Sequence, residues 1–208
     1  MSSTWINQSP TGDKPGLPTK KAGWFSKSFH WSDFAFAALL VAAAGYASQQ
    51  YHSFMDIYEI TILWSCVPVT AYMAYRWGSL KWLILTVAGL SLLAISSYGG
   101  DLAAAEQKFF LKYLLSSQSA ILWMGVMFVV ATVSYWIGLV GRSPTAGFVG
   151  TALTWGAVVM GFAGMFIRWY ESYLIGPDVG HIPVSNLYEV FVLFALITAI
   201  YYLFYEQV

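Results

Sequence analysis

Residues 119–140 read SAILWMGVMFVVATVSYWIGLV, and no charged residue interrupts them. A helix needs about 20 mostly apolar residues to cross a bilayer, so this run is long enough to do so. Its apolar residues are continuous, which is typical of a membrane helix, whereas the strands of a membrane barrel alternate apolar and polar residues. The stretch therefore predicts a helical integral membrane protein.

The composition of the whole chain supports this class. Of its 208 residues 58% are apolar and 10% are charged, whereas a soluble domain carries about a quarter charged residues. The formal net charge is zero, so no nucleic-acid partner is indicated. The apolar composition makes the lipid bilayer the expected environment. The lone cysteine, Cys66, excludes an internal disulfide and a cysteine-based metal cage.

Further apolar runs lie on both sides of the first one. Together they predict an all-α integral membrane protein, a polytopic bundle of about six transmembrane helices. The expected spans are residues 33–48, 57–75, 80–97, 119–140, 148–167 and 187–205.

Lysine and arginine residues predict the orientation of this bundle, because cytoplasmic segments carry an excess of them. We interpret residues 1–30 as a flexible cytoplasmic tail and residues 31–208 as the transmembrane domain. Both termini are then cytoplasmic, and residues 49–56, 98–118 and 168–186 form outer loops, of which 98–118 lies along the membrane interface. Inner segments hold Lys14, Lys20, Lys21, Lys27, Arg76, Lys81 and Arg142, and outer segments hold Lys108, Lys112 and Arg168.

Two of the expected helices begin with similar sequences. Asp56 is followed by Glu59, and Asn186 is followed by Glu189, each at a spacing of three residues. Asp or Asn caps a first helical turn, and a Glu three residues later can accept from the cap's own amide. One interpretation is a capping device used twice, and the other is two related places around one outer site. A carboxylate in a membrane is costly unless it faces protein or water, so we expect both glutamates to point into the bundle.

The second of these starts carries a family resemblance. Residues 180–190 read GHIPVSNLYEV, and this stretch resembles the CcsA/ResC-type membrane subunit of System II cytochrome c biogenesis, sometimes labelled CcsB in proteobacteria. Residues 55–59 and 109–123 also look like its proteobacterial members. The motif consists of Gly180, His181, Pro183, Ser185, Asn186, Leu187, Tyr188 and Glu189.

The resemblance implies a role in cytochrome c maturation. Members of this family help to carry haem b outward and present it for attachment to apocytochrome c, with a CcsB/ResB-type membrane partner. The resemblance also implies that the protein lies in the bacterial inner (cytoplasmic) membrane. The family's tryptophan-rich outer segment and its flanking histidines are not found here. We therefore expect this chain to be the N-terminal half of such a protein, either truncated or from a split gene. The complete complex of the family resembles a cytochrome c synthase, but we expect that this chain alone is not a haem lyase.

Four outer residues are candidates for contact with haem: His181, Arg168, Glu189 and His52. Imidazole ligates haem iron, and a guanidinium matches a carboxylate such as a haem propionate in two-point geometry. Each candidate also has a structural interpretation: a loop histidine bound to backbone, a snorkelling arginine, a helix cap or an interfacial polar residue. No catalytic residue and no metal site are predicted.

Two other functions compete with haem handling. A structural scaffold in a membrane complex needs only a bundle of helices. A transporter subunit needs polar residues near the bilayer middle, and the expected spans place only uncharged ones there, such as Ser65, Thr86 and Thr132. This absence of charge disfavours ion or proton coupling.

Overall fold

The computed structural model describes residues 29–207, apart from 54, 177–179 and 181. Almost all of the expected tail, residues 1–30, thus lies outside the described residues. The elements in chain order are α1 (Trp31–Gln50), α2 (Ile57–Arg76), α3 (Gly78–Tyr98), α4 (Ala104–Gln107), the π-helical turn η1 (Leu111–Leu115), α5 (Ser117–Val140), α6 (Pro144–Ile175) and α7 (Leu187–Gln207).

Six of these helices, all but α4, are long and apolar enough to cross a membrane. The prediction of an all-α, multi-pass membrane protein is therefore confirmed. The expected spans agree with the helices to within a few residues, with one exception at α6, which has 32 residues.

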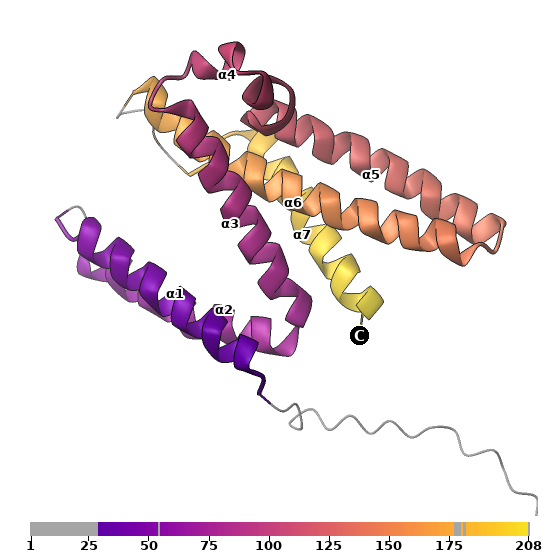
Figure 1. Ribbon diagram of the computed structural model, residues 1–208, viewed down its shortest axis with the longest axis horizontal. Helices are drawn as coiled ribbons and strands as arrows, with labels where there is room; N and C mark the ends of the chain where they lie inside the picture. Colours follow the sequence, from indigo (N-terminus) through magenta and orange to yellow (C-terminus); the bar gives the residue numbers. More distant parts are fainter. Residues whose placement is uncertain (1–28, 54, 177–179, 181, 208) are drawn as a thin grey trace, which may run out of the picture.

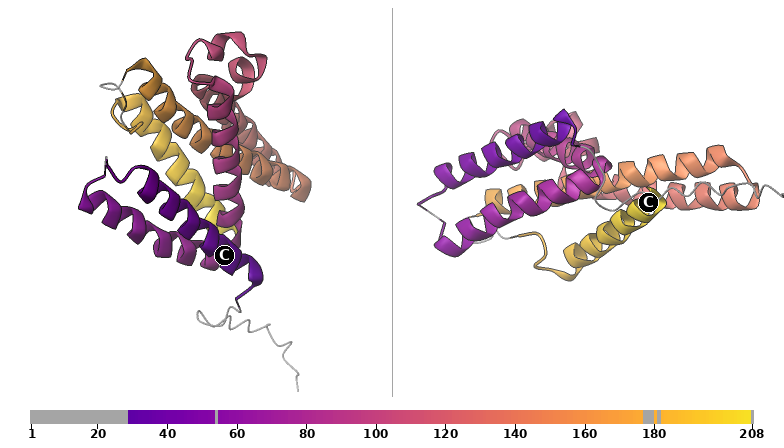
Figure 2. Two further views of the ribbon diagram at one scale, coloured as in Figure 1. Left: turned by 60° about the vertical axis from the view of Figure 1, so that its left-hand side comes forward. Right: turned by 90° about the horizontal axis from the view of Figure 1, so that it is seen from below.

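The helices form two hairpins with α3 between them (Figures 1 and 2). The α1–α2 hairpin lies on one side of α3, and the α5–α6 hairpin lies on the other, with α7 against α6. Burial differs strongly between the two sides. In the most apolar window of α6, 56% of the residues are buried, against 6% in that of α2. The core therefore sits around α6.

Small residues let α6 occupy this central place. Ala157 is fully buried, and a Cβ added at Gly161 would lie 2.5 Å from side-chain atoms of Leu196 and of Met124. Small residues at a spacing of four allow helices to approach closely. Ala157 and Gly161 thus allow close packing of α6, with α5 on one side and α7 on the other.

The long α6 corrects the expected outer loop at residues 168–186. The helix begins with Ser143 as N-cap and Pro144 in the first turn, a position that suits proline because no N–H is needed there. It then continues past Arg168 to Ile175. The expected span stopped at the charge of Arg168, but Glu171 and Ser172 are buried and have polar partners, so the helix extends and the loop begins only at Gly176.

The connection between α3 and α5 is folded onto the bundle. Its aromatic residues Phe109 and Tyr113 are exposed, which fits the expected position along a membrane interface. It is not one continuous helix, however, because α4 and η1 are separate short turns. Leu111 and Leu115 are buried in the core beside α3 and α5, so the segment also packs against the helices.

The bundle has two ends that differ in their polar residues. The α4 end is where α3 finishes, α5 begins and α4 lies (Figure 1). The Gln207 end is the opposite end, where α1 begins and α7 finishes.

Candidate functional site at the α4 end

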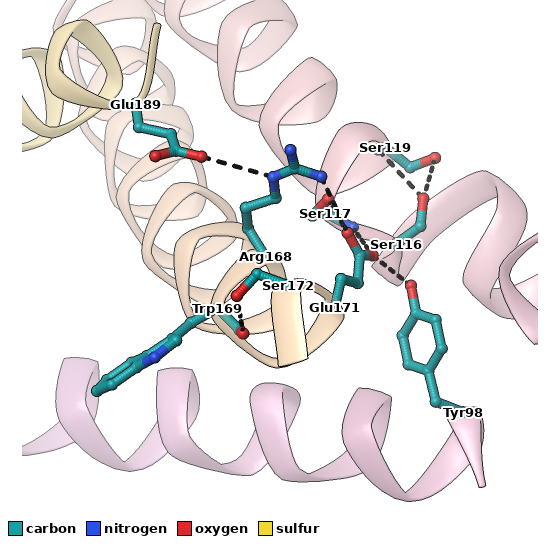
Figure 3. A network of polar contacts seen from close by, with 9 residues as sticks. All are labelled: Tyr98, Ser116, Ser117, Ser119, Arg168, Trp169, Glu171, Ser172 and Glu189. Atoms are coloured by element: carbon teal, nitrogen blue, oxygen red, sulfur yellow. Dashed lines mark hydrogen bonds and ion pairs between the residues drawn. The ribbon is translucent and has the colours of Figure 1, made fainter. Parts of the chain in front are cut away.

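A buried carboxylate, Glu171 on α6, is the centre of a polar network at the α4 end (Figure 3). The hydroxyl of Tyr98 donates to its Oε1 at 2.5 Å, and the backbone N–H of Ser117 donates to the same oxygen at 3.1 Å. The Ser117 hydroxyl donates to Oε2 at 2.5 Å. Glu171 accepts all three of these bonds, and it lies at the N-terminus of α5, a place that favours an acidic side chain.

Arg168, one turn before Glu171, lies between two carboxylates. Its Nη1 is 3.9 Å from Oε2 of Glu171, and its Nε is 3.6 Å from Oε1 of Glu189 on α7. Both glutamates are buried, whereas 39% of the Arg168 side chain is exposed. The interpretation of Arg168 as a snorkelling arginine is therefore incomplete, since Arg168 also joins α6 to α7 electrostatically.

Glu189 combines this ion pair with the start of α7. The Oδ1 atom of Asn186 accepts from the Glu189 N–H at 2.9 Å, which is the expected cap. The carboxylate of Glu189 accepts from the Ser185 N–H at 3.1 Å and from the Ser185 hydroxyl at 3.3 Å. Glu189 was expected to accept from the N–H of the cap residue Asn186. It accepts instead from the N–H of Ser185, the residue before the cap.

The start of α2 shows the same sequence pattern in a different environment. Asp56 caps the helix, and its N–H donates to Glu59 Oε2 at 3.0 Å, which completes a capping box. Glu59 is exposed, whereas Glu189 is 4% exposed. The expectation that both glutamates point into the bundle is right for Glu189 and wrong for Glu59. The physical reason is that α2 packs mainly against α1 and α3, and within the described residues no cation pairs with Glu59.

The network joins four helices, α3, α5, α6 and α7, through one cation and two carboxylates. Side-chain hydrogen bonds and ion pairs in apolar surroundings are stronger than in water, and an unpaired member is costly. The residues that link the helices are Tyr98, Ser117, Arg168, Glu171 and Glu189. This arrangement holds the four helices together at the α4 end.

Beside the network lies an apolar groove of about 460 Å³ between α3 and α6. Trp169, Tyr170 and Tyr173 line it, and in Figure 3 the Trp169 ring points towards α3 and away from Glu171. The indole N–H of Trp169 and the hydroxyl of Ser91 are buried there without a hydrogen-bond partner.

The remaining predicted residues are dispersed. His52 is exposed in the α1–α2 turn, on the other hairpin, and His181 lies outside the described residues. Within the motif, Pro183 is buried, Leu187 and Tyr188 are exposed, and the Gly180 N–H donates to the Gly176 carbonyl at 3.2 Å. A Cβ added at Gly180 would lie 2.1 Å from the Tyr173 ring, so glycine lets the loop pass against α6.

Sequence analysis missed Tyr98 and Ser117 as members of the site. Tyr98 is the last residue of an apolar run before two glycines, and Ser117 is one of several serines before α5. Neither pattern indicates a partner 73 or 54 residues away along the chain. In the part of the chain that the structure describes, no three His, Cys, Asp or Glu residues are grouped so that they could hold a metal ion.

Comparison with protein-family models, with curated proteins and with solved structures finds no match to this chain. The resemblance of residues 180–190 to a cytochrome c biogenesis family therefore stays a prediction.

Proposed function

We propose that this chain is a membrane component of cytochrome c maturation that helps to present haem at the outer face of the bacterial inner membrane. Its termini are then cytoplasmic and its α4 end faces outward. It works with a CcsB/ResB-type partner and with the tryptophan-rich half that resembling proteins carry. Haem is the cargo of this reaction, and the chain alone is not a haem lyase.

One observation carries this proposal beyond the sequence resemblance: the guanidinium of Arg168 is 39% exposed, and its ion pairs with Glu171 and Glu189 are too long to be direct hydrogen bonds. No described acceptor lies within hydrogen-bond distance of it, because both glutamates are at 3.6 Å or more. A carboxylate such as a haem propionate is the partner that its paired N–H groups fit best. Glu189, from the family-like motif, and Glu171 hold this guanidinium at the end of α6.

The described residues supply only this part of a haem site. His52 is on the other hairpin, and His30 precedes α1 at the Gln207 end. Neither histidine is beside Arg168. The described residues that we assign to haem therefore contact its propionate edge, and none of them is a ligand of its iron.

A structural scaffold is the second candidate. The observation that favours it is that both glutamates of the network already have donors: Glu171 accepts from Tyr98 on α3 and Ser117 on α5, and Glu189 accepts from Ser185 just before its own helix. On this alternative, Arg168 only holds α6 and α7 together.

Cytochrome maturation in the complete system tests the proposal. Arg168→Gln removes the charge, and Lys112→Gln is the matched control, because Lys112 is an exposed cation at the same end. Holocytochrome is measured per amount of membrane-inserted protein. We expect Arg168→Gln to lower this ratio at least tenfold, Arg168→Lys to restore part of it and Lys112→Gln to leave it unchanged.

The scaffold gives a different result. If Arg168→Gln lowers only the amount of folded protein, and the holocytochrome per folded protein is unchanged, the haem role of Arg168 is wrong. We also expect no holocytochrome when this chain and a CcsB/ResB-type partner are combined without the tryptophan-rich half. Robust maturation in that experiment would show that the active part has been misplaced.

A further inference from the structure

The apolar groove between α3 and α6 contains two buried polar atoms that no described residue satisfies. They are the indole nitrogen of Trp169 and the hydroxyl oxygen of Ser91, and both residues line the groove. Ser91 is 6% exposed. A buried donor without an acceptor is costly, because its hydrogen bond to water has been lost. A ligand that accepts from these two groups therefore gains free energy on binding.

Comparable side chains elsewhere in the bundle do have partners. The indole N–H of Trp123 donates to the Tyr113 carbonyl at 2.8 Å. The Thr132 hydroxyl donates to the carbonyl one turn before it, also at 2.8 Å, which is a common bond for a hydroxyl inside a helix. Within the described residues, Trp169 and Ser91 hold the only buried side-chain nitrogen or oxygen atoms that lack a partner, and they share one groove.

The groove has the size of a small-molecule site. Its volume is about 460 Å³, which lies within the range of about 300–1,000 Å³ for ligand pockets. Its lining residues fall within 88–95 of α3 and 166–173 of α6, which is about two turns of each helix. A membrane helix of a partner protein packs along more turns than this, so a compact ring fits the groove better than a helix.

The two donors lie at a depth that phospholipid head groups do not reach. Helix α3 has 21 residues and is thus about 31 Å long, close to the thickness of the hydrocarbon core. Ser91 precedes the last residue of α3, Tyr98, by about 10 Å along the helix. Head groups lie outside the hydrocarbon core. An acceptor that reaches these donors must therefore belong to a molecule that enters the hydrocarbon.

We propose that this groove binds the head group of an isoprenoid quinone. The two carbonyl oxygens of a quinone accept and do not donate, which suits the Trp169 N–H and the Ser91 hydroxyl. Its flat ring packs against the aromatic rings of Phe166, Tyr170 and Tyr173, which line the same groove. Phe166 and Tyr173 are also exposed to the surroundings, so the isoprenoid tail remains in lipid.

The quinone groove and the arginine assigned to haem lie on different faces of α6. In Figure 3 the Trp169 ring points towards α3, whereas Arg168 points towards Glu189 of α7. Quinone binding therefore does not depend on the haem role of Arg168. Loss of one property in a variant leaves the other in place, so the two can be tested separately.

Two variants remove the donors, and a third removes the same kind of donor elsewhere. Trp169→Phe keeps an aromatic ring but removes the indole N–H, and Ser91→Ala removes the hydroxyl. Trp123→Phe is the control, because Trp123 lies near the start of α5, at the same end of the bundle and outside this groove. The probes are a naphthoquinone with a short isoprenoid tail and the naphthalene with the same substituents, which has no carbonyl.

Binding of each probe to the full chain in detergent is measured by titration with native mass spectrometry. We expect the wild type to bind the quinone at least about tenfold more tightly than the naphthalene, since hydrogen bonds form in apolar surroundings. Trp169→Phe should weaken quinone binding at least about fivefold and Ser91→Ala about threefold. Neither variant should change naphthalene binding, and Trp123→Phe should leave the binding of both probes unchanged.

Each other outcome overturns the proposal. Equal affinity of the wild type for the two probes, or no binding of either, means that the groove does not recognise a carbonyl and takes at most a lipid tail. If Trp169→Phe weakens both probes equally, the ring and not its N–H holds the ligand. Equal losses in Trp169→Phe and Trp123→Phe place the site elsewhere. If Trp169→Phe does not fold, Ser91→Ala decides, and an unchanged quinone affinity in that variant contradicts the assignment.

Discussion

Asp56–Glu59 and Asn186–Glu189 start their helices with the same sequence pattern, yet the two glutamates have different surroundings. At α2 the pattern forms an exposed capping box, and among the described residues Glu59 has no ion pair with another helix. At α7 it forms a cap whose buried Glu189 also faces Arg168 of α6. The comparison shows that a local signature predicts the local hydrogen bonds, whereas the neighbouring helix decides whether the same residue also links the fold.

The difference follows from the position of each helix. The starting residues of α7 meet the long α6, which carries Arg168 and Glu171 beyond the expected end of the membrane span. The start of α2 lies on the α1–α2 hairpin, which is mostly exposed to its surroundings. Substitutions at the α7 start or at its partners can therefore be compared with matched substitutions elsewhere. For each variant the free energy of unfolding is measured by denaturing detergent titration, followed by circular dichroism.

The largest effect is expected at Glu171. Replacing it with alanine leaves the hydroxyl of Tyr98 and the N–H and hydroxyl of Ser117 without their acceptor, and it removes one of the two carboxylates that pair with Arg168. We expect Glu171→Ala to lower the free energy of unfolding by about 3–5 kcal/mol, the cost of breaking a buried charge network. Glu106→Ala is the control, and its exposed pair with Lys112 should contribute about 1 kcal/mol or less. Similar losses in the two variants would mean that Glu171 is not a centre of the fold.

The two glutamates of the helix starts should differ clearly. Glu189→Ala removes both the bonds from Ser185 and the ion pair with Arg168, and we expect a loss of about 2–4 kcal/mol. Glu59→Ala removes only an exposed capping bond and should cost about 0.5–1 kcal/mol. Equal losses would remove the distinction between the two helix starts.

The caps themselves should be equivalent. Asn186→Ala and Asp56→Ala each remove one side-chain acceptor from a first turn, so each is expected to cost about 1 kcal/mol. A much larger loss for Asn186→Ala would place the difference between the two starts in the cap and not in Glu189.

The sequence was sufficient to predict most of the fold, because membrane spans depend on the length and continuity of apolar runs. Residues 119–140 lie wholly inside α5 (Ser117–Val140), and the capping residues Asp56 and Asn186 mark the helix starts that the structure has. The prediction was wrong at the end of α6, which continues to Ile175 although a loop was expected from residue 168. Charged and polar residues after an apolar run indicate a loop when the groups that pair with them are unknown. Those partners come from α3, α5 and α7, and no local pattern shows them.

The candidate site was predictable only in part. Arg168 and Glu189 stand out as charged residues beside apolar runs, and the structure brings them together. His52 was grouped with them because it is also on an expected outer loop, but loops at one end of a bundle need not be neighbours. Tyr98 and Ser117 belong to the network because α3 and α5 pack against α6, and that packing is a property of the assembled helices.

A double-mutant cycle between Arg168 and Glu189 tests the central claim, that the α7 start is electrostatically linked to α6 and the α2 start is not. The variants are Arg168→Met, Glu189→Gln and their combination, with Glu59→Gln replacing Glu189→Gln in the matched cycle. Gln keeps the capping acceptor in both helices, so only the charge changes. We predict a coupling energy of about 1 kcal/mol or more between Arg168 and Glu189, and none beyond about 0.5 kcal/mol between Arg168 and Glu59. Coupling energies that are both near zero would contradict the account, because Glu189 would then be a cap and nothing more.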